Sequence, residues 1–442
     1  MNPFLSALYR FLKIVARIAI RIYYPRTTII NRAGLHFDNP AIVVSNHPNT
    51  LIDVLLSASR IHRQVFFLAN AGLFKTPFTD WLFSTLYCIP IERYDDTGGK
   101  PLNNADAFAR CDAFLGAGGA LFIAPEGNSW MLRRMQKLKT GTARIAFSAE
   151  SKNDFKLGLM IHPVGLTYED PQRFGSRVLV NVGAPIRIAD FQEDYVNNPI
   201  EAVRKLTAFM EARMRALTID TLDDEEDQLL RVIERVMRNN HEDWTNEQHF
   251  FQSQAMLESL RTWKQEAPQS FETYRAQALD YGQQLEALQL TDRAVVARQQ
   301  PNADLLRWLQ IPLALLGLPV FLYGWLNHLL PAGIPVLLKR KLKLYPGYDA
   351  TVKLMTGLFS FPIFYWLQSK AVETWFGNAG SWWYLLTLPL AGWLALLFRK
   401  QVPKWQADWR IWRLARKAPE IVRKLENSRI QAPNLEGGRI DD

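Results

Sequence analysis

The chain has 442 residues, which is too long for one ordinary domain and long enough for two or three. Hydrophobic residues make up 48% of it and charged residues 21%, and these near-average shares exclude a disordered or collagen-like chain. The formal net charge is +9. Two cysteines, Cys88 and Cys111, exclude a disulfide framework and a multi-cysteine zinc site, and they fit a reducing compartment.

The positive charge is concentrated near the two ends of the chain. Residues 1–35 carry six Lys or Arg and no acidic residue, and residues 399–429 carry ten Lys or Arg and three acidic residues. Both segments lie beside strongly apolar stretches, which is typical of proteins that bind an anionic membrane surface. A nucleic-acid-binding protein would instead present basic residues on one folded face among stacking aromatic side chains. The pattern therefore indicates membrane lipids as partners and no nucleic acid.

Residues 1–35 predict an amphipathic basic helix that docks on a membrane. Arg10, Lys13, Arg17 and Arg21 follow one another at spacings of three and four residues, which places them on one face of a helix. Apolar residues cover much of the remaining surface, as they do in helices that lie in the membrane interface. The charges interrupt any apolar run that could serve as a secretory signal. The alternative is a helix that packs on its own domain.

Residues 36–215 predict an α/β catalytic domain. Short apolar runs alternate with helical stretches, as expected for helices layered on a largely buried sheet. The strands that we predict cover residues 41–45, 65–68, 88–91, 120–124, 160–166 and 178–182. Helices are predicted between them at residues 52–59, 103–115 and 142–149.

Two kinds of helix are predicted after this domain. Residues 216–305 are rich in Glu, Gln and Arg with apolar residues at helical spacing, so we predict a polar helical connector. Residues 306–400 predict transmembrane or re-entrant hydrophobic helices, because they contain three uncharged stretches. These stretches cover residues 311–338, 354–369 and 374–398. The alternative for them is a buried helical bundle.

The charges around the first uncharged stretch bear on membrane topology. The stretch has 28 residues and four prolines, which is longer than the roughly 20 residues that one spanning helix needs. A basic cluster at residues 339–343 follows it, and the positive-inside tendency places that cluster in the cytoplasm. With a cytoplasmic catalytic domain, the stretch must enter and return, as a helical hairpin or a re-entrant element. We therefore expect an integral membrane protein, with the catalytic domain and a basic Trp-rich tail at 401–442 on the cytoplasmic face.

The most informative chemistry lies between Ser45 and Asp53. A predicted strand ends just before His47, and Asp53 follows six residues later on the first turn of a predicted helix. This layout lets the carboxylate fold back on the imidazole, fix its tautomer and stabilise the imidazolium after proton uptake. Such a pair without a nucleophilic Ser or Cys suits direct activation of a substrate hydroxyl by a general base. The alternative is that Asp53 only stabilises the helix N-terminus.

Other candidate residues follow the ends of other predicted strands. Glu126 and Gly127 come after residues 120–124, and Gly127 would permit close backbone approach to a ligand. Arg93 follows residues 88–91, and Lys139 precedes a helix whose N-terminus suits an anion. A base, an orienting acid and basic groups at strand ends together suit acyl transfer to a phosphorylated alcohol. The alternatives are a structural turn for Glu126 and Gly127 and a solvated surface position for Arg93.

Other kinds of site are not indicated. No HExxH or paired-carboxylate pattern occurs, so we infer no metal, and no bound cofactor is expected. The residues around Ser129 do not form a Gly-x-Ser-x-Gly elbow, so a serine hydrolase is not indicated. His162 lies inside an apolar strand and is interpreted as a core residue.

These segments resemble the four sequence blocks of the glycerophospholipid acyltransferase family, in the same order and over roughly residues 35–215. The family's usual blocks include Asn-His-x4-Asp, Phe-Pro-Glu-Gly-Thr-Arg-Ser and an apolar Pro-Val-Gly run. The corresponding residues here are Asn46-His47 with Asp53, Arg93, Pro125-Glu126-Gly127, and Pro163-Val164-Gly165. The resemblance implies His47 as the catalytic base with Asp53 as its partner. It also implies an acceptor-phosphate site shaped by Arg93, Glu126 and Gly127.

The sequence departs from this pattern in three places. Five residues rather than four separate His47 from Asp53, Ala124 replaces the Phe, and Asn128-Ser129 replaces the Thr-Arg of the third block. The longer spacing resembles the subgroup of glycerol-3-phosphate and dihydroxyacetone-phosphate acyltransferases, which similarly carries hydrophobic segments after the catalytic domain. Arg133, Arg134 or Lys139 would have to replace the phosphate contact of the lost arginine.

The sequence thus predicts a membrane-bound O-acyltransferase of phospholipid biosynthesis. We expect it to transfer a fatty acyl group from acyl-CoA or acyl-acyl carrier protein to glycerol-3-phosphate or dihydroxyacetone phosphate. The alternative acceptor is lysophosphatidate, which would give phosphatidate, and another lysophospholipid comes after it. A hydrolase or transacylase that works without a thioester is a further possibility. So is a non-enzymatic membrane scaffold with an inactive acyltransferase fold.

Overall fold

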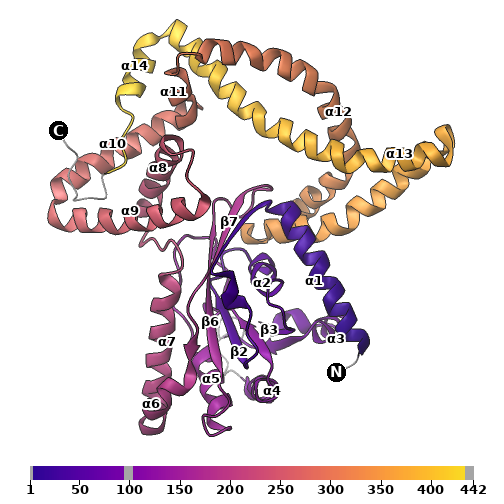
Figure 1. Ribbon diagram of the computed structural model, residues 1–442, viewed down its shortest axis with the longest axis vertical. Helices are drawn as coiled ribbons and strands as arrows, with labels where there is room; N and C mark the ends of the chain where they lie inside the picture. Colours follow the sequence, from indigo (N-terminus) through magenta and orange to yellow (C-terminus); the bar gives the residue numbers. More distant parts are fainter. Residues whose placement is uncertain (1–2, 94–102, 434–442) are drawn as a thin grey trace. The chain divides into compact units, whose positions relative to one another are not determined.

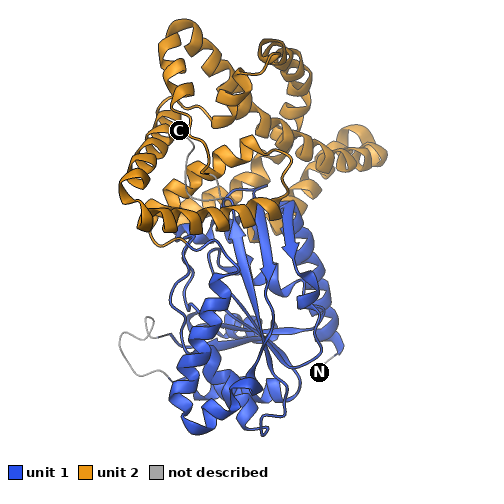
Figure 2. Ribbon diagram, turned by 60° about the vertical axis from the view of Figure 1, so that its left-hand side comes forward, with its two compact units in different colours: residues 1–220, 344–354 blue, residues 221–343, 355–442 orange. Residues whose placement is uncertain are grey.

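The computed structural model describes residues 3–93 and 103–433 (Figure 1). These residues fall into two compact units (Figure 2). Unit 1 comprises Met1–Asp220 together with Leu344–Leu354, and unit 2 comprises Thr221–Lys343 together with Met355–Asp442. Unit 1 is a mixed α/β domain. Among the described residues of unit 2, all the regular secondary structure is helical, so the chain joins an N-terminal α/β part to a long helical C-terminal region.

One sheet runs through unit 1. Its strands are β1 (Arg26–Ile30), β2 (Ala41–Ser45), β3 (Val65–Asn70), β4 (Cys88–Ile91), β5 (Ala120–Ile123), β6 (Met160–Tyr168), β7 (Arg177–Val182) and β8 (Ile186–Arg187). Their order across the sheet is β1-β7-β6-β2-β5-β3-β4, with β8 also paired to β6. The five strands from β6 to β4 are parallel, whereas β7 runs antiparallel to β6. The carboxyl ends of those five strands therefore meet at one edge of the sheet.

Both faces of the sheet are covered, which explains why its strands read as continuous apolar runs. Every residue of β2 is buried, and successive side chains of β2 enter opposite cores. Ile42 and Val44 pack in a cluster with side chains of α4 (Ala105–Gly116), α5 (Gly141–Ser151) and α7 (Pro199–Arg215). Ala41 and Val43 pack with side chains of α1 (Pro3–Tyr23) and α2 (Leu51–Ala58). Unit 1 also contains α3 (Pro77–Thr85) and α6 (Gln192–Asn197).

Helix α1 contacts its own domain through two of the basic residues that the sequence aligned on one face. Lys13 Nζ donates to the carbonyls of Ile61 and Arg63, and Arg17 Nε donates to the carbonyl of Ser59 at 2.5 Å. Apolar side chains of α1 remain exposed, namely Phe4, Phe11, Ile14, Ile18 and Ile22. The helix thus has both a domain contact and an exposed apolar surface, and its docking on a membrane stays a prediction.

Unit 2 contains polar helices and two long apolar ones. The polar helices are α8 (Asp224–Asn240), α9 (Asn246–Glu266), α10 (Pro268–Ala287), α11 (Asp292–Arg298) and α14 (Pro419–Asn427). The apolar helices are α12 (Ala303–Leu342) and α13 (Asp349–Lys417), the first residues of α13 belonging to unit 1. Two described helical segments, Ala303–Leu342 and Pro346–Lys417, are long and apolar enough to cross a membrane by length and composition.

The apolar helices differ from the expected hairpin in one respect. Residues 311–338, predicted as a helical hairpin or re-entrant element, lie within the single helix α12, which is bent in Figure 1. They therefore do not form a hairpin of two separate helices, and a re-entrant course through a membrane stays a prediction. The four internal prolines of α12 bend the helix without ending it, since each removes one hydrogen bond of the helical ladder. Instead the break lies in α13 at Gly377, whose φ of 68° is left-handed. Gly324 of α12 lies directly against the backbone of Ala391 of α13, where a Cβ would be 2.4 Å from the carbonyl oxygen.

Candidate active site

The predicted site residues lie in loops at one edge of the sheet of unit 1. His47 follows β2, Glu126 follows β5 and Arg93 follows β4, and these strands run in the same direction. Because the carboxyl ends of parallel strands meet at one edge, residues far apart in sequence are brought to the same set of loops. Contacts between these loops determine what each side chain is able to do.

His47 and Asp53 form a hydrogen-bonded pair. Nδ1 of His47 lies 3.0 Å from Oδ2 of Asp53, and the Asp53 side chain is fully buried whereas that of His47 is 13% exposed. The backbone N–H of Asn49 also donates to Oδ2, at 2.6 Å. With the carboxylate as acceptor, Nδ1 carries the proton and Nε2 of the neutral ring keeps its lone pair.

Tyr168, at the end of β6, completes the surroundings of Asp53. Its hydroxyl donates to Oδ1 of Asp53 at 2.6 Å. Burial, together with the charge of Asp53, raises the pKa of Tyr168 well above its ordinary value, so the phenol stays protonated and remains a donor. Sequence reasoning gave Tyr168 no role. The available signal was its place in the fourth sequence block, but only the pairing of β6 beside β2 brings it to Asp53.

The loop that carries His47 is attached to β6 by a side-chain amide. Asn46 donates through Nδ2 to the carbonyl of Leu166 at 2.9 Å and accepts at Oδ1 from the N–H of Leu166 at 2.7 Å. The side-chain amide of Asn46 thus makes the two hydrogen bonds to β6 that the backbone of a strand residue would make, although β2 has already ended. They fix the backbone immediately before His47.

Glu126 joins the His47 loop to the segment that precedes α5. Its Oε1 accepts from the N–H of His47 at 2.9 Å, and its Oε2 accepts from the N–H of Gln136 at 3.0 Å. Burial raises the pKa of Glu126, and the two hydrogen bonds oppose that rise because they favour the carboxylate. The carboxylate therefore contacts backbone groups on both sides, an arrangement that holds His47 in place.

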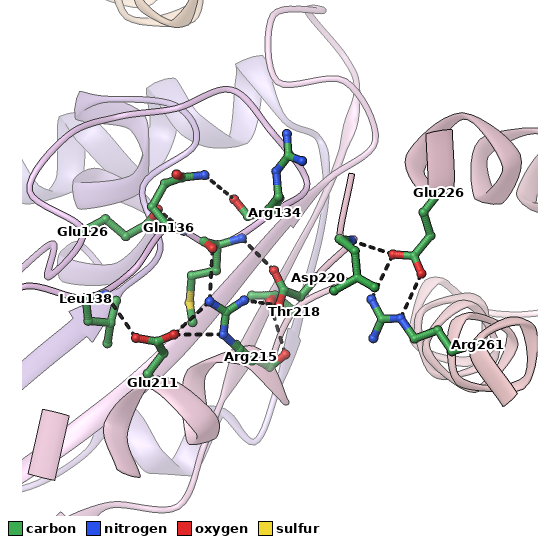
Figure 3. A network of polar contacts seen from close by, with 12 residues as sticks. Glu126, Arg134, Gln136, Leu138, Glu211, Arg215, Thr218, Asp220, Glu226 and Arg261 are labelled. Carbon is green, nitrogen blue, oxygen red and sulfur yellow. Dashed lines mark hydrogen bonds and ion pairs between the residues drawn. The ribbon is translucent and has the colours of Figure 1, made fainter. Parts of the chain in front are cut away.

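Residues 135–138, which include the Gln136 that donates to Glu126, are held by side chains at and beyond the end of α7 (Figure 3). Arg215 forms an ion pair with Glu211 at 2.9 Å and another with Asp220. These carboxylates in turn accept from the N–H groups of Leu138 and Met135, at 3.2 and 2.7 Å. Residues 135–138 are thus held from α7, and through Gln136 and Glu126 they hold the backbone of His47.

The remaining predicted residues lie near the same third-block loop. Arg93 donates through a guanidinium nitrogen to Oδ1 of Asn128 at 2.9 Å. Gly127 has a φ of 82°, which a residue with a side chain would adopt only under strain, and a Cβ there would lie 3.5 Å from Cγ of Lys139. Lys139 is exposed, and its N–H donates to the carbonyl of Pro125 at 2.8 Å. Arg93, Gly127 and Lys139 therefore all adjoin residues 125–128.

Chemically, the arrangement presents a neutral imidazole with an oriented, buried carboxylate behind it. Nε2 of His47 has no hydrogen-bond partner among the described residues, so it can accept a proton from a hydroxyl. His162 does not take part: it is buried, stacks on Phe37 at 4.2 Å, and its Nδ1 lies 3.1 Å from the carbonyl oxygen of Gly34. In residues 3–93 and 103–433, no group of three or more His, Cys, Asp or Glu is placed to hold a metal ion.

Known proteins resemble this part of the chain. The family model for Acyltransferase matches residues 25–167. The uncharacterized acyltransferase C1718.04 of Schizosaccharomyces pombe is 27% identical over 126 residues, which is 28% of this chain and 18% of the length of that relative. Among solved structures, the 1-acyl-sn-glycerophosphate acyltransferase PlsC from Thermotoga maritima is 17% identical with a TM-score of 0.35. That likeness covers 48% of this chain and 79% of the PlsC chain.

The family match contains His47, Asp53, Arg93, Glu126, Gly127 and Lys139, and it extends to Thr167, one residue before Tyr168. Residues 25–167 are therefore the part of the chain that is similar to the acyltransferase family.

Proposed function

We propose that the protein is a membrane-bound O-acyltransferase that transfers a fatty acyl group from a thioester to the hydroxyl of a phosphorylated glycerol acceptor. The observation that carries this proposal is the His47–Asp53 pair, with Nδ1 bonded to a buried carboxylate and Nε2 left to accept a proton. The pair lies inside the segment that matches the acyltransferase family.

The reaction follows from the chemistry of a neutral imidazole. Nε2 of His47 takes the proton of the acceptor hydroxyl while the hydroxyl oxygen attacks the thioester carbonyl and a new C–O bond forms. Asp53 accepts from Nδ1 throughout and stabilises the imidazolium that results. The tetrahedral oxyanion then collapses and the C–S bond breaks. The departing thiolate takes the proton from the imidazolium and leaves as the thiol of coenzyme A or acyl carrier protein.

For the acceptor, we propose glycerol-3-phosphate or dihydroxyacetone phosphate. The five residues between His47 and Asp53 support this choice through the resemblance to that acyltransferase subgroup. Arg93 and Lys139 would supply positive charge for the acceptor phosphate, since both adjoin the loop around Gly127. Lysophosphatidate carries the same phosphate and is the alternative acceptor within the same chemistry.

We further propose that the protein is held at a membrane by α12 and α13. Both are long and apolar enough to cross a bilayer, and few residues of their most apolar stretches are buried. The exposed apolar side chains of α1 would add an interfacial contact. We propose that the catalytic domain faces the cytoplasm and that α12 enters and leaves the membrane on that side, because residues 344–354, which follow α12, belong to the same unit as the catalytic domain. A site at the membrane would suit a reaction that joins a water-soluble acceptor to a fatty acyl chain.

The test is an acceptor panel on membranes that contain the full chain. Labelled glycerol-3-phosphate, dihydroxyacetone phosphate and lysophosphatidate are each incubated with acyl-CoA, and parallel membranes carry His47→Ala. Labelled lysophosphatidate, or its dihydroxyacetone counterpart, formed only by the unmodified protein would support both the chemistry and the acceptor. Conversion of lysophosphatidate alone would keep the chemistry and replace the acceptor.

Two results would contradict the proposal itself. If His47→Ala membranes formed as much product, the histidine would not be the base. If none of the three acceptors reacted with acyl-CoA or with acyl-acyl carrier protein, the proposed acyl transfer from a thioester to a phosphorylated glycerol acceptor would be wrong. Acyl transfer that persisted without any thioester would indicate a transacylase or hydrolase instead.

A further inference from the structure

A segment from late in the chain belongs to the core of unit 1. Residues 344–354 lie between α12 and the body of α13, yet they are part of unit 1. Ala350 is fully buried and Leu354 is 7% exposed, and both pack in the core cluster that contains Ile52 and Leu56 of α2. The segment is therefore integrated into the hydrophobic core beneath the helix that carries Asp53.

The same segment holds Thr50, which lies between His47 and Asp53. Oγ1 of Thr50 donates to the carbonyl of Gly347 at 3.3 Å and lies 2.8 Å from Oγ1 of Thr351. Because the single hydroxyl proton of Thr50 goes to the carbonyl, Thr351 is the donor in the second bond. The φ of Thr50 is 47°, a conformation that a β-branched residue keeps only when its neighbours impose it.

The segment also contacts the other side of the catalytic loop. The hydroxyl of Tyr345 accepts from the N–H of Met131 at 3.0 Å. Met131 follows Trp130, whose N–H donates to the carbonyl of His47 at 3.2 Å. The backbone around His47 is thus held from Thr50 on one side and from residues 130–131 on the other, and the segment 344–354 contacts both.

A third attachment fixes the segment in place. Lys353 Nζ donates to the carbonyl of Gln172 at 3.0 Å and forms an ion pair with the buried carboxylate of Asp349 at 3.6 Å. Gln172 Nε2 in turn donates to the carbonyl of Pro346 at 3.2 Å. These bonds hold the segment at both ends, so its contacts with the catalytic loop are made by a fixed backbone.

We propose that residues 344–354 are a positioning element of the acyl-transfer site and that Thr351 is a positioning residue. The segment maintains the strained Thr50 and so sets the backbone path by which Asp53 reaches His47. The expected effect on the rate of acyl transfer rests on the proposed function. The contacts of residues 344–354 with the loop that carries His47 can be tested without measuring enzyme activity. This inference assigns a catalytic contribution to a segment that adjoins the apolar helices in sequence.

The first test compares three threonine variants of the full chain in membranes. Thr351→Val keeps the shape of the side chain and removes its hydroxyl, whereas Thr351→Ser keeps the hydroxyl. Thr207→Val is the matched control, because the Thr207 hydroxyl is also buried and donates to a backbone carbonyl, that of Val203, at 2.7 Å. For Thr351→Val we expect kcat to fall about fivefold with KM for both substrates within twofold, the effect of one lost hydrogen bond.

The comparison separates positioning from general stability. Thr351→Ser should restore kcat to within twofold of the unmodified protein, and Thr207→Val should lower the thermal midpoint without lowering kcat. Unchanged kcat in Thr351→Val would overturn the proposal. An equal loss of kcat in Thr207→Val would also overturn it, because any buried hydroxyl would then have the same effect.

A second measurement does not depend on activity. Tyr345→Phe removes the acceptor of the Met131 N–H, so hydrogen exchange in residues 129–132 should become at least fivefold faster while exchange in β5 stays unchanged. Unchanged exchange in 129–132 would show that the segment does not hold this loop and would overturn the proposal. If exchange accelerates but no acceptor is acylated, the proposed function fails while the positioning contact stands.

Discussion

Tyr168 and Asp53 form a buried hydrogen bond of 2.6 Å, which no residue spacing in the sequence predicts. The phenol occupies Oδ1 of the carboxylate, while Oδ2 receives the His47 ring and the N–H of Asn49. A carboxylate with donors on both oxygens cannot rotate away from the imidazole. The His47–Asp53 pair is therefore held by β6, the strand that carries Tyr168. This strand pairs with one side of β2, and β5 pairs with the other side.

Replacing Tyr168 by Phe tests this relationship. Loss of a hydrogen bond to a charged group costs about 1.5–3 kcal/mol, so we expect kcat to fall roughly ten- to a hundredfold with little change in KM. Steady-state kinetics on the full chain provide the measurement. Tyr281→Phe is the control, since its hydroxyl donates to buried Asp292 at 2.5 Å in unit 2. Equal kcat in Tyr168→Phe and the unmodified protein would contradict the role given to this bond.

Glu126 is predicted to act on His47 through the backbone. In Glu126→Gln the side-chain NH2 would oppose one of the two N–H donors, of His47 or Gln136, which costs about 1–3 kcal/mol. Glu150→Gln is a matched control, because buried Glu150 likewise accepts from two N–H groups, of Leu157 and Leu159. We expect both variants to unfold at lower temperature but only Glu126→Gln to lose kcat. Similar kcat in the two variants would show that Glu126 has only a structural role.

Buried His162 predicts a loss of stability in acid. Desolvation by burial lowers the pKa of His162 from 6.5 to about 4, against the hydrogen bond to Gly34, which raises it. Between these pH values the unfolded chain binds more protons than the folded one, so the free energy of unfolding rises with pH. The contribution of His162 to the free energy of unfolding is roughly 3 kcal/mol at most. It is fully present above pH 6.5 and is lost as the pH falls towards 4.

The comparison variant for this effect is His162→Gln, which cannot titrate. Urea unfolding of the detergent-solubilised chain at pH 7, 6, 5 and 4 should show a shallower pH dependence for the variant. Parallel curves for the two proteins would mean that His162 does not take up a proton on unfolding in this range.

Arg93 is predicted to contribute to acceptor binding. Removing a charge-assisted contact to phosphate should raise KM for the acceptor about tenfold in Arg93→Ala and leave KM for the acyl thioester unchanged. Arg204→Ala serves as the control, since Arg204 is exposed and pairs with Glu201 at 3.5 Å. Equal changes in both KM values would place Arg93 in a structural role beside Asn128.

Local patterns were enough to predict most of the sheet. Each of the six predicted strands is present with its ends shifted by at most two residues, because each is an apolar run. Four of them, β2, β5, β6 and β7, are almost entirely buried. The sequence did not predict β1, whose Arg26-Thr27-Thr28 start lacks such a run and was included in the N-terminal helical segment. Pairing with β7 makes these residues a strand, and that pairing is a tertiary effect.

The site was predictable where its residues are close in sequence. His47 and Asp53 lie within one loop and its following helix, so their spacing alone indicated contact. Tyr168 reaches Asp53 because β6 pairs with β2. Thr351 lies 301 residues after Thr50 in the chain and contacts it only in the folded structure. No linear pattern encodes these contacts.

The central claim is that Nε2 of His47 is the base for acyl transfer, and acceptor-dependent thiol release tests it most directly. The rate of free thiol formation from acyl-CoA is measured with saturating acceptor for the full chain, His47→Ala and His62→Ala. His62 is the control because its Nε2 pairs with Asp38 at 3.3 Å on the surface. The account predicts a loss of about 10²–10⁴-fold in His47→Ala and none in His62→Ala. Equal rates in His47→Ala and the unmodified protein would contradict it.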